Sequence, residues 1–203
     1  MESRIAKVIS VLFHPLVMPT YIFVLLLTLN AHFALILPLK AKGLLLGMIF
    51  ISTCILPLLM IILFKHIGKV MSTEIEGRQE RILALIISGV FYYLSWRMLR
   101  QMHFSPIFQL FMIGTFYALV FTLLINLFWK ISFYMVAAGS AAGMLIGLSL
   151  LLNQPVQIII VVTIVISGII GFARLKLESH DPAQIYLGWI VGLAVMLLVM
   201  NLL

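Results

Sequence analysis

Long apolar segments separated by short polar ones run along the whole chain. The apolar segments are each about twenty residues long and show no alternation of polar and apolar positions, which favours membrane-spanning helices over the strands of a barrel. Seven such segments are predicted, at residues 16–38, 43–64, 82–99, 106–129, 131–152, 156–173 and 183–203. We therefore predict an all-α, polytopic membrane bundle of six to seven transmembrane helices, forming a single domain over residues 1–203.

The composition supports a membrane protein and excludes several other classes. Charged residues make up 9% of the chain and apolar residues 64%, whereas a soluble domain has about 25% charged residues. The net charge of +7 does not indicate nucleic-acid binding, because no soluble domain is present to carry a basic face. Lipid phosphate groups are the expected anionic partner. Cys54 is the single cysteine, so no intrachain disulfide forms.

The charges are distributed unevenly over the predicted topology. With seven spans, the loops after the second, fourth and sixth lie on the same side as the N-terminus, together with every carboxylate of the chain. The other side holds Lys40, Lys42, Arg97 and Arg100. The positive-inside rule makes the crowded side cytoplasmic, but the cations of a functional site would bias that count, so sidedness stays open. We expect the three charged loops, 65–81, 130–134 and 174–182, to converge on one face.

Glycines recur at four-residue intervals in two of the predicted spans. Gly139, Gly143 and Gly147 lie in one of them, and Gly188 and Gly192 lie in the other. Small residues at this spacing allow two helices to approach closely in lipid. We predict that these two spans pack against each other, and a direct ligand role for the glycines is the less favoured alternative.

The segment between the last two spans contains the most polar cluster of the chain. Asp181 precedes a proline, and Gln184 follows three residues later, which is the spacing of a capping box at the start of a helix. His180 then lies just before that helix, where free amides favour an anion. Arg174 and Lys176 precede it, and such a loop suits phosphate. The alternative is an interfacial histidine beside snorkelling cations.

The remaining polar features have ordinary interpretations when each is taken alone. The loop 65–81 resembles a charged amphipathic surface with ion pairs. Lys130 is typical of a snorkelling cation, and Asn126 and Ser132 are typical of interhelical hydrogen-bonding residues or helix caps. His14 and Pro15 favour a structural turn before the first span over a ligand site.

One spacing resembles a known signature: Arg174, five intervening residues, then His180, between the last two spans. The type 2 phosphatidic acid phosphatase superfamily has Ser-Arg, five residues, His, three residues, Asp in its third signature. Residues 130–133 resemble the region of the second signature. Residues 14–15 and 76–81 are similar to a bacterial branch of small membrane proteins related to these phosphatases.

The resemblance implies an activity. His180 would attack a lipid phosphate, Arg174 and Lys130 would hold its oxygens, and water would release phosphate from the histidine. The substrate-binding set that it implies is completed by Ser132, Tyr134, Lys176, Arg78 and Arg81. The substrate would be a phosphorylated lipid or a prenyl diphosphate, no metal or other cofactor would be needed, and the location would be a bacterial inner membrane.

The chain also departs from the family pattern, and these departures keep a second function open. Gln184 stands where the third signature has Asp, although Glu178 or Asp181 is a possible substitute that supports the histidine. Tyr134 is the residue nearest to the position where the second signature has its proton-donating histidine. A phenol with a pKa of about 10 is a poor acid at neutral pH.

The first signature is absent, and Arg78 and Arg81 are its nearest cations. The alternative is a catalytically degenerate protein that binds lipid headgroups or supports a membrane partner. A transporter is disfavoured, because few ionisable groups lie at mid-membrane depth.

Overall fold

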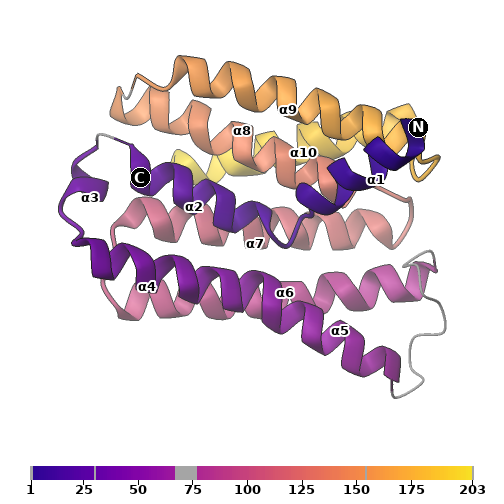
Figure 1. The fold of residues 1–203 in the computed structure, drawn as a ribbon, viewed down its shortest axis with the longest axis horizontal. Coiled ribbons are helices and arrows are strands. Elements are labelled where there is room, and N and C mark those ends of the chain that lie inside the picture. Colours follow the sequence, from indigo (N-terminus) through magenta and orange to yellow (C-terminus); the bar gives the residue numbers. More distant parts are fainter. Residues whose placement is uncertain (1, 30, 67–76, 154, 203) are drawn as a thin grey trace.

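In the computed structural model the described residues, which are 2–29, 31–66, 77–153 and 155–202, form helices joined by turns and contain no strand. Its elements are α1 (Glu2–Leu12), α2 (Met18–Thr28), α3 (His32–Leu35), α4 (Leu39–Phe50), the π-helical turn η1 (Ile51–Ile55), α5 (Leu56–His66), α6 (Arg78–Gln101), α7 (Pro106–Asn126), α8 (Phe133–Leu152), α9 (Gln157–Lys176) and α10 (Pro182–Met200). They lie roughly side by side in one bundle (Figure 1).

Six helices are long and apolar enough to cross a membrane, which confirms the predicted helical membrane bundle. The first is the continuous run of α4, η1 and α5 over Leu39–Phe64, and the others are α6, α7, α8, α9 and α10. The predicted spans 106–129 and 131–152 imply a reversal at Lys130, and it is present, because α7 ends at Asn126 and α8 begins at Phe133. A single helix over both segments would be about twice as long as a bilayer is thick.

The predicted first span, residues 16–38, is wrong as a single helix. Within it the structure has α2, of 11 residues, and the short α3. The helix ends because Leu29 and Ala31 adopt extended backbone conformations. The apolar composition of this stretch predicted burial correctly, since α2 packs into the core through Phe23, whose ring stacks on Phe108 of α7 at 5.4 Å.

Between α1 and α2 the helix is interrupted at residues 13–17, and side-chain hydroxyls satisfy carbonyl groups around the interruption. Tyr21 donates to the carbonyl of Leu12 at 3.0 Å, and Tyr92 donates to Pro15 at 3.3 Å. Thr53 donates to the carbonyl of Leu16 at 3.3 Å. Free carbonyls at a helix end need such partners, so this interruption is a defined feature that fixes the direction of α1.

The predicted packing of the two glycine-rich helices is confirmed in α8 and α10. A methyl group on Gly192 would overlap the carbonyl oxygen of Val136 on α8. On α8, a methyl group on Gly143 would lie 2.8 Å from the carbonyl oxygen of Leu193. The two backbones therefore approach closely enough to exclude any side chain at these positions.

We expect Gly192→Ala to destabilise the protein by about 1–3 kcal/mol, because the added methyl group forces the two helices apart. Gly168→Ala on α9 is the matched control, since nothing lies within 4 Å of the methyl group that it adds. The melting temperature in detergent measures both. If Gly192→Ala and Gly168→Ala melt together, the α8–α10 contact is not as close as described.

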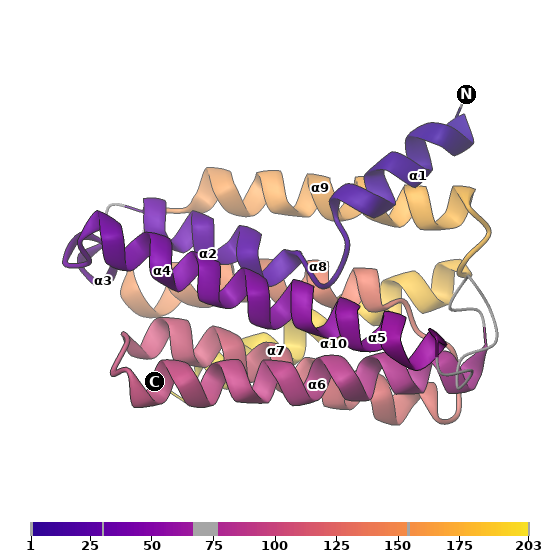
Figure 2. The same ribbon diagram turned by 60° about the horizontal axis from the view of Figure 1, so that its bottom comes forward.

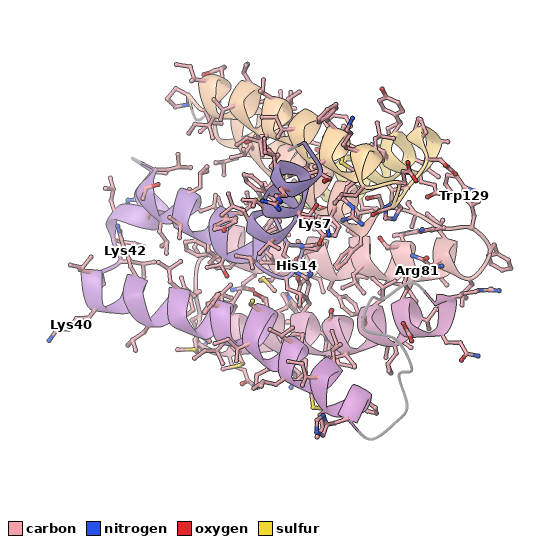
Figure 3. The ribbon with its side chains drawn as sticks, turned by 45° about the vertical axis from the view of Figure 1, so that its right-hand side comes forward. Lys7, His14, Lys40, Lys42, Arg81 and Trp129 are labelled. Atoms are coloured by element: carbon pink, nitrogen blue, oxygen red, sulfur yellow. The ribbon has the colours of Figure 1, made fainter. Side chains whose placement is uncertain are left out.

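The three charged segments meet at one end of the bundle, as predicted. The start of α6, the turn between α7 and α8, and the turn between α9 and α10 lie together (Figure 2). Residues 67–76 of the first loop lie outside the described residues. Arg81 and Trp129 are at this end, whereas Lys40 and Lys42 are at the opposite one (Figure 3).

Candidate functional site

The site begins at the N-terminus of α8, where Ser132 is the residue before the first helical turn. Its backbone N–H donates to the carbonyl of Gln184 at 3.3 Å, which ties the start of α8 to the first turn of α10. Ser132 is 0% exposed, and its hydroxyl has no hydrogen-bond partner among the described residues. The predicted capping role of this hydroxyl is therefore wrong.

At the start of α10 the predicted capping box is confirmed. The backbone N–H of Gln184 donates to the Asp181 carboxylate, and the backbone N–H of Asp181 donates to the side-chain oxygen of Gln184 at 3.4 Å. The side-chain amide of Gln184 also donates to that carboxylate at 3.3 Å. The Asp181 carboxylate is thus committed to the cap, and Glu178 is exposed. The expectation that one of these carboxylates supports His180 is wrong among the described contacts, since Nδ1 of His180 has no partner.

His180 lies directly before this cap and is held neutral. Its Nδ1 is buried and has no partner among the described residues, so Nε2 is the ring nitrogen that hydrogen-bonds to the backbone of Ile131. Burial, followed by the charges of Arg174, Lys130 and Arg81, lowers the pKa of His180 to about 3, and the hydrogen bond to Ile131 offsets only part of this shift. At neutral pH the imidazole thus offers an unprotonated nitrogen surrounded by cations.

Arg174 lies in the last turn of α9, one residue after the predicted span ends, and is half-buried. Its guanidinium stacks on the ring of Tyr134 at 4.3 Å. Its Nη1 donates to the hydroxyl of Ser10 at 3.4 Å. Its Nε is buried with no partner among the described residues, so one donor of this cation is left for a ligand.

Two further cations, Arg81 and Lys130, lie close enough to His180 to lower its pKa. Arg81, in the first turn of α6, donates from Nε to the Asn126 side chain of α7 at 3.4 Å, and of the two roles predicted for Asn126 this is the interhelical one. Lys130, in the turn before α8, is half-buried and close enough to His180 to affect its pKa. Arg78 and Lys176 are exposed at the ends of α6 and α9, and the charge of Arg78 acts on Arg81.

Together these groups have the properties of an oxyanion site. Two helix N-termini converge on it, and both carry partial positive charge. Arg174 and Ser132 offer a buried N–H and a buried O–H without partners among the described residues, and such donors bind phosphate oxygens strongly. Within the described part of the chain, no group of three or more His, Cys, Asp or Glu residues could hold a metal ion.

The sequence did not identify two members of this cluster, Ser10 and His14. The ring of His14 meets the ring of Tyr134 edge to face at 5.6 Å, and burial, followed by the charge of Arg174, lowers the pKa of His14. The dipeptide His14-Pro15 was a visible signal and part of the family resemblance, but by itself it favoured a structural turn over a ligand site. Neither a family model, nor a curated protein, nor a solved structure matches this chain.

We expect the protein without bound anion to lose stability as the pH falls below neutral. The pKa of His180 is about 3 in the folded protein and about 6.5 in an unfolded chain. The unfolded state therefore binds more protons between these values, and stability falls as the pH falls. His14 acts in the same direction.

The melting temperature in detergent, measured at neutral pH and near about pH 4.5, tests this expectation. His180→Asn should reduce the loss, whereas His103→Asn should keep it, because His103 is exposed in the turn between α6 and α7. An equal loss in His180→Asn and the parent would show that His180 is not a buried neutral histidine.

Proposed function

We propose that this protein binds the phosphate of a phosphorylated membrane lipid at the site around His180 and hydrolyses it with His180 as the nucleophile. The observation that carries the proposal is the buried Nδ1 of His180, which has no partner among the described residues and lies under the influence of three cations. A neutral imidazole has a lone pair available for attack, and the cations favour the phosphate that it attacks.

In this reaction Nδ1 of His180 attacks the terminal phosphorus, and the bond from that phosphorus to the leaving oxygen breaks. The leaving group takes the electron pair. The phosphorylated ring keeps its proton on Nε2, which is hydrogen-bonded to the backbone of Ile131. Water then attacks the phosphorus, the P–N bond breaks, and orthophosphate and the neutral histidine are released. Arg174 and the hydroxyl of Ser132 stabilise the charge on the phosphoryl oxygens throughout.

The chemistry of the leaving group favours a lipid diphosphate over a lipid monophosphate. A lipid alcohol must be protonated as it leaves, and proton donation by a positioned acid is the usual solution. His14 and His180 both have lowered pKa values and are neutral, and a phenol such as Tyr134 is a poor acid at neutral pH. A phosphate leaving group, whose second pKa is about 6, needs no such proton because it is stable as an anion.

A catalytically inactive headgroup-binding protein is the second candidate, and one observation favours it. The Asp181 carboxylate is hydrogen-bonded to Gln184, so no carboxylate of the described residues orients and supports His180 as one does in catalytic triads. Such a protein would bind the same anion but release no phosphate.

Phosphate release from purified protein in detergent tests the proposal. The substrates are a prenyl diphosphate, the corresponding monophosphate, and inorganic pyrophosphate, which separates a lipid from a soluble source of the same chemistry. We expect turnover of the prenyl diphosphate to be fastest and to be insensitive to EDTA. Anion-dependent stabilisation without turnover would favour the second candidate, and the absence of both would contradict the proposed function.

A further inference from the structure

The N-terminal segment reaches the site from the other end of the sequence. Ser10 of α1 is 164 positions from Arg174, to which it is hydrogen-bonded, and it is 7% exposed. The helix α1 packs against α9, which carries Arg174 (Figure 2). The contact is therefore part of a helix–helix interface and is not a chance meeting of surface side chains.

The orientation of Arg174 is set from two directions. The Nη1 end is held by the Ser10 hydroxyl, and the flat face is held by the ring of Tyr134. Both partners are neutral, so the positive charge of the guanidinium is not cancelled by them. A carboxylate in either place would compete with a bound anion for the guanidinium, whereas a hydroxyl and an aromatic ring fix its direction and leave its charge available.

His14 holds the other member of this stack. The backbone N–H of Leu16 donates to Nδ1 of His14 at 3.3 Å, which assigns Nδ1 as an acceptor and fixes the plane of the ring. The rings of His14 and Tyr134 meet edge to face at an interplanar angle of 79°. The hydroxyl groups of Tyr92 and Thr53 donate to the carbonyls of Pro15 and Leu16. These bonds hold the backbone next to His14 in place between α1 and α2.

We propose that Ser10 and His14 are positioning residues of the anion site. Ser10 holds the guanidinium of Arg174 directly, and His14 holds it through Tyr134, so that the Nε of Arg174 faces the bound phosphate. This inference rests on the proposed function, because it assumes that the anion binds beside Arg174 and His180. It assigns the N-terminal segment to the site that the later helices form.

The test measures the affinity of the purified full-length protein for orthovanadate, through the shift of its melting temperature in detergent. We expect Ser10→Ala and His14→Ala each to weaken orthovanadate binding roughly three- to ten-fold, the range of one ordinary hydrogen bond or packing contact. Ser10→Thr, which keeps the hydroxyl, should bind close to the parent. A purely structural role would lower the melting temperature without anion and leave this affinity unchanged.

Ser167→Ala is the matched control. Ser167 is a buried serine on α9, the helix of Arg174, and its hydroxyl donates to the carbonyl of Thr163 at 2.8 Å. If Ser10→Ala does not fold, His14→Ala decides the question. Parent-like affinity in the folded variants would overturn the inference and leave the anion site standing. A parent that does not bind orthovanadate would overturn the proposed function and the inference with it.

Discussion

His180→Asn is expected to abolish nearly all phosphate release and to leave only the small rate that the remaining cations support. Asparagine keeps a hydrogen-bonding side chain of moderate size but has no nitrogen lone pair that can attack phosphorus. Loss of a nucleophile costs on the order of 10⁶-fold in turnover in a well-studied hydrolase. The variant should still be stabilised by orthovanadate, because Arg174, Lys130 and Arg81 remain. Its turnover is measured with the prenyl diphosphate under single-turnover and steady-state conditions.

The control for this variant is His103→Asn. His103 is exposed in the turn between α6 and α7, at the opposite end of the bundle, and has a positive φ of 55° that asparagine tolerates. Turnover in His103→Asn should equal that of the parent. A His180→Asn variant that releases phosphate at the parental rate would show that the nucleophile is another group.

Arg174→Ala is expected to have the second-largest effect, a loss of about 10²–10³-fold in turnover, as when one preorganised donor is removed from an oxyanion site. Alanine removes the buried Nε and also the group that stacks on Tyr134. Arg174→Lys should recover only part of this loss, because an ammonium group has neither the flat face nor the rigid set of donors of a guanidinium.

Arg97→Ala is the matched control for Arg174→Ala. Arg97 is exposed near the far end of α6, and its removal should leave turnover unchanged. If Arg174→Ala is folded by circular dichroism and its turnover is within a few-fold of the parent, this guanidinium is not part of the site.

The fold was largely predictable because lipid imposes simple demands on a sequence. Six apolar helices were recognisable by length and composition, and the glycine repeats predicted the packing of α8 on α10. The first span failed because its apolar composition masks a local change of backbone: Leu29 and Ala31 are extended without any glycine or proline to indicate it. Hydrophobicity predicts burial here but does not predict where a helix ends.

Part of the site was predictable for a different reason. Asp181 and Gln184 form a local capping pattern, which places His180 directly before a helix N-terminus whatever the tertiary packing of that helix. Ser10 and His14 carry no such pattern, since their roles depend on α1 packing against α9 and on the interruption that turns His14 toward Tyr134. Contacts over 164 positions of sequence arise from the tertiary arrangement and leave no local signal.

The most direct measurement of the central claim is the capture of a phosphate group on His180. The protein is mixed with a prenyl diphosphate carrying a radioactive terminal phosphate, quenched with base, and digested for mass spectrometry. We predict an acid-labile, base-stable label on the peptide that contains His180, absent from His180→Asn and present in His103→Asn. Rapid release of phosphate by the parent with no label on His180 at any quench time would contradict the account.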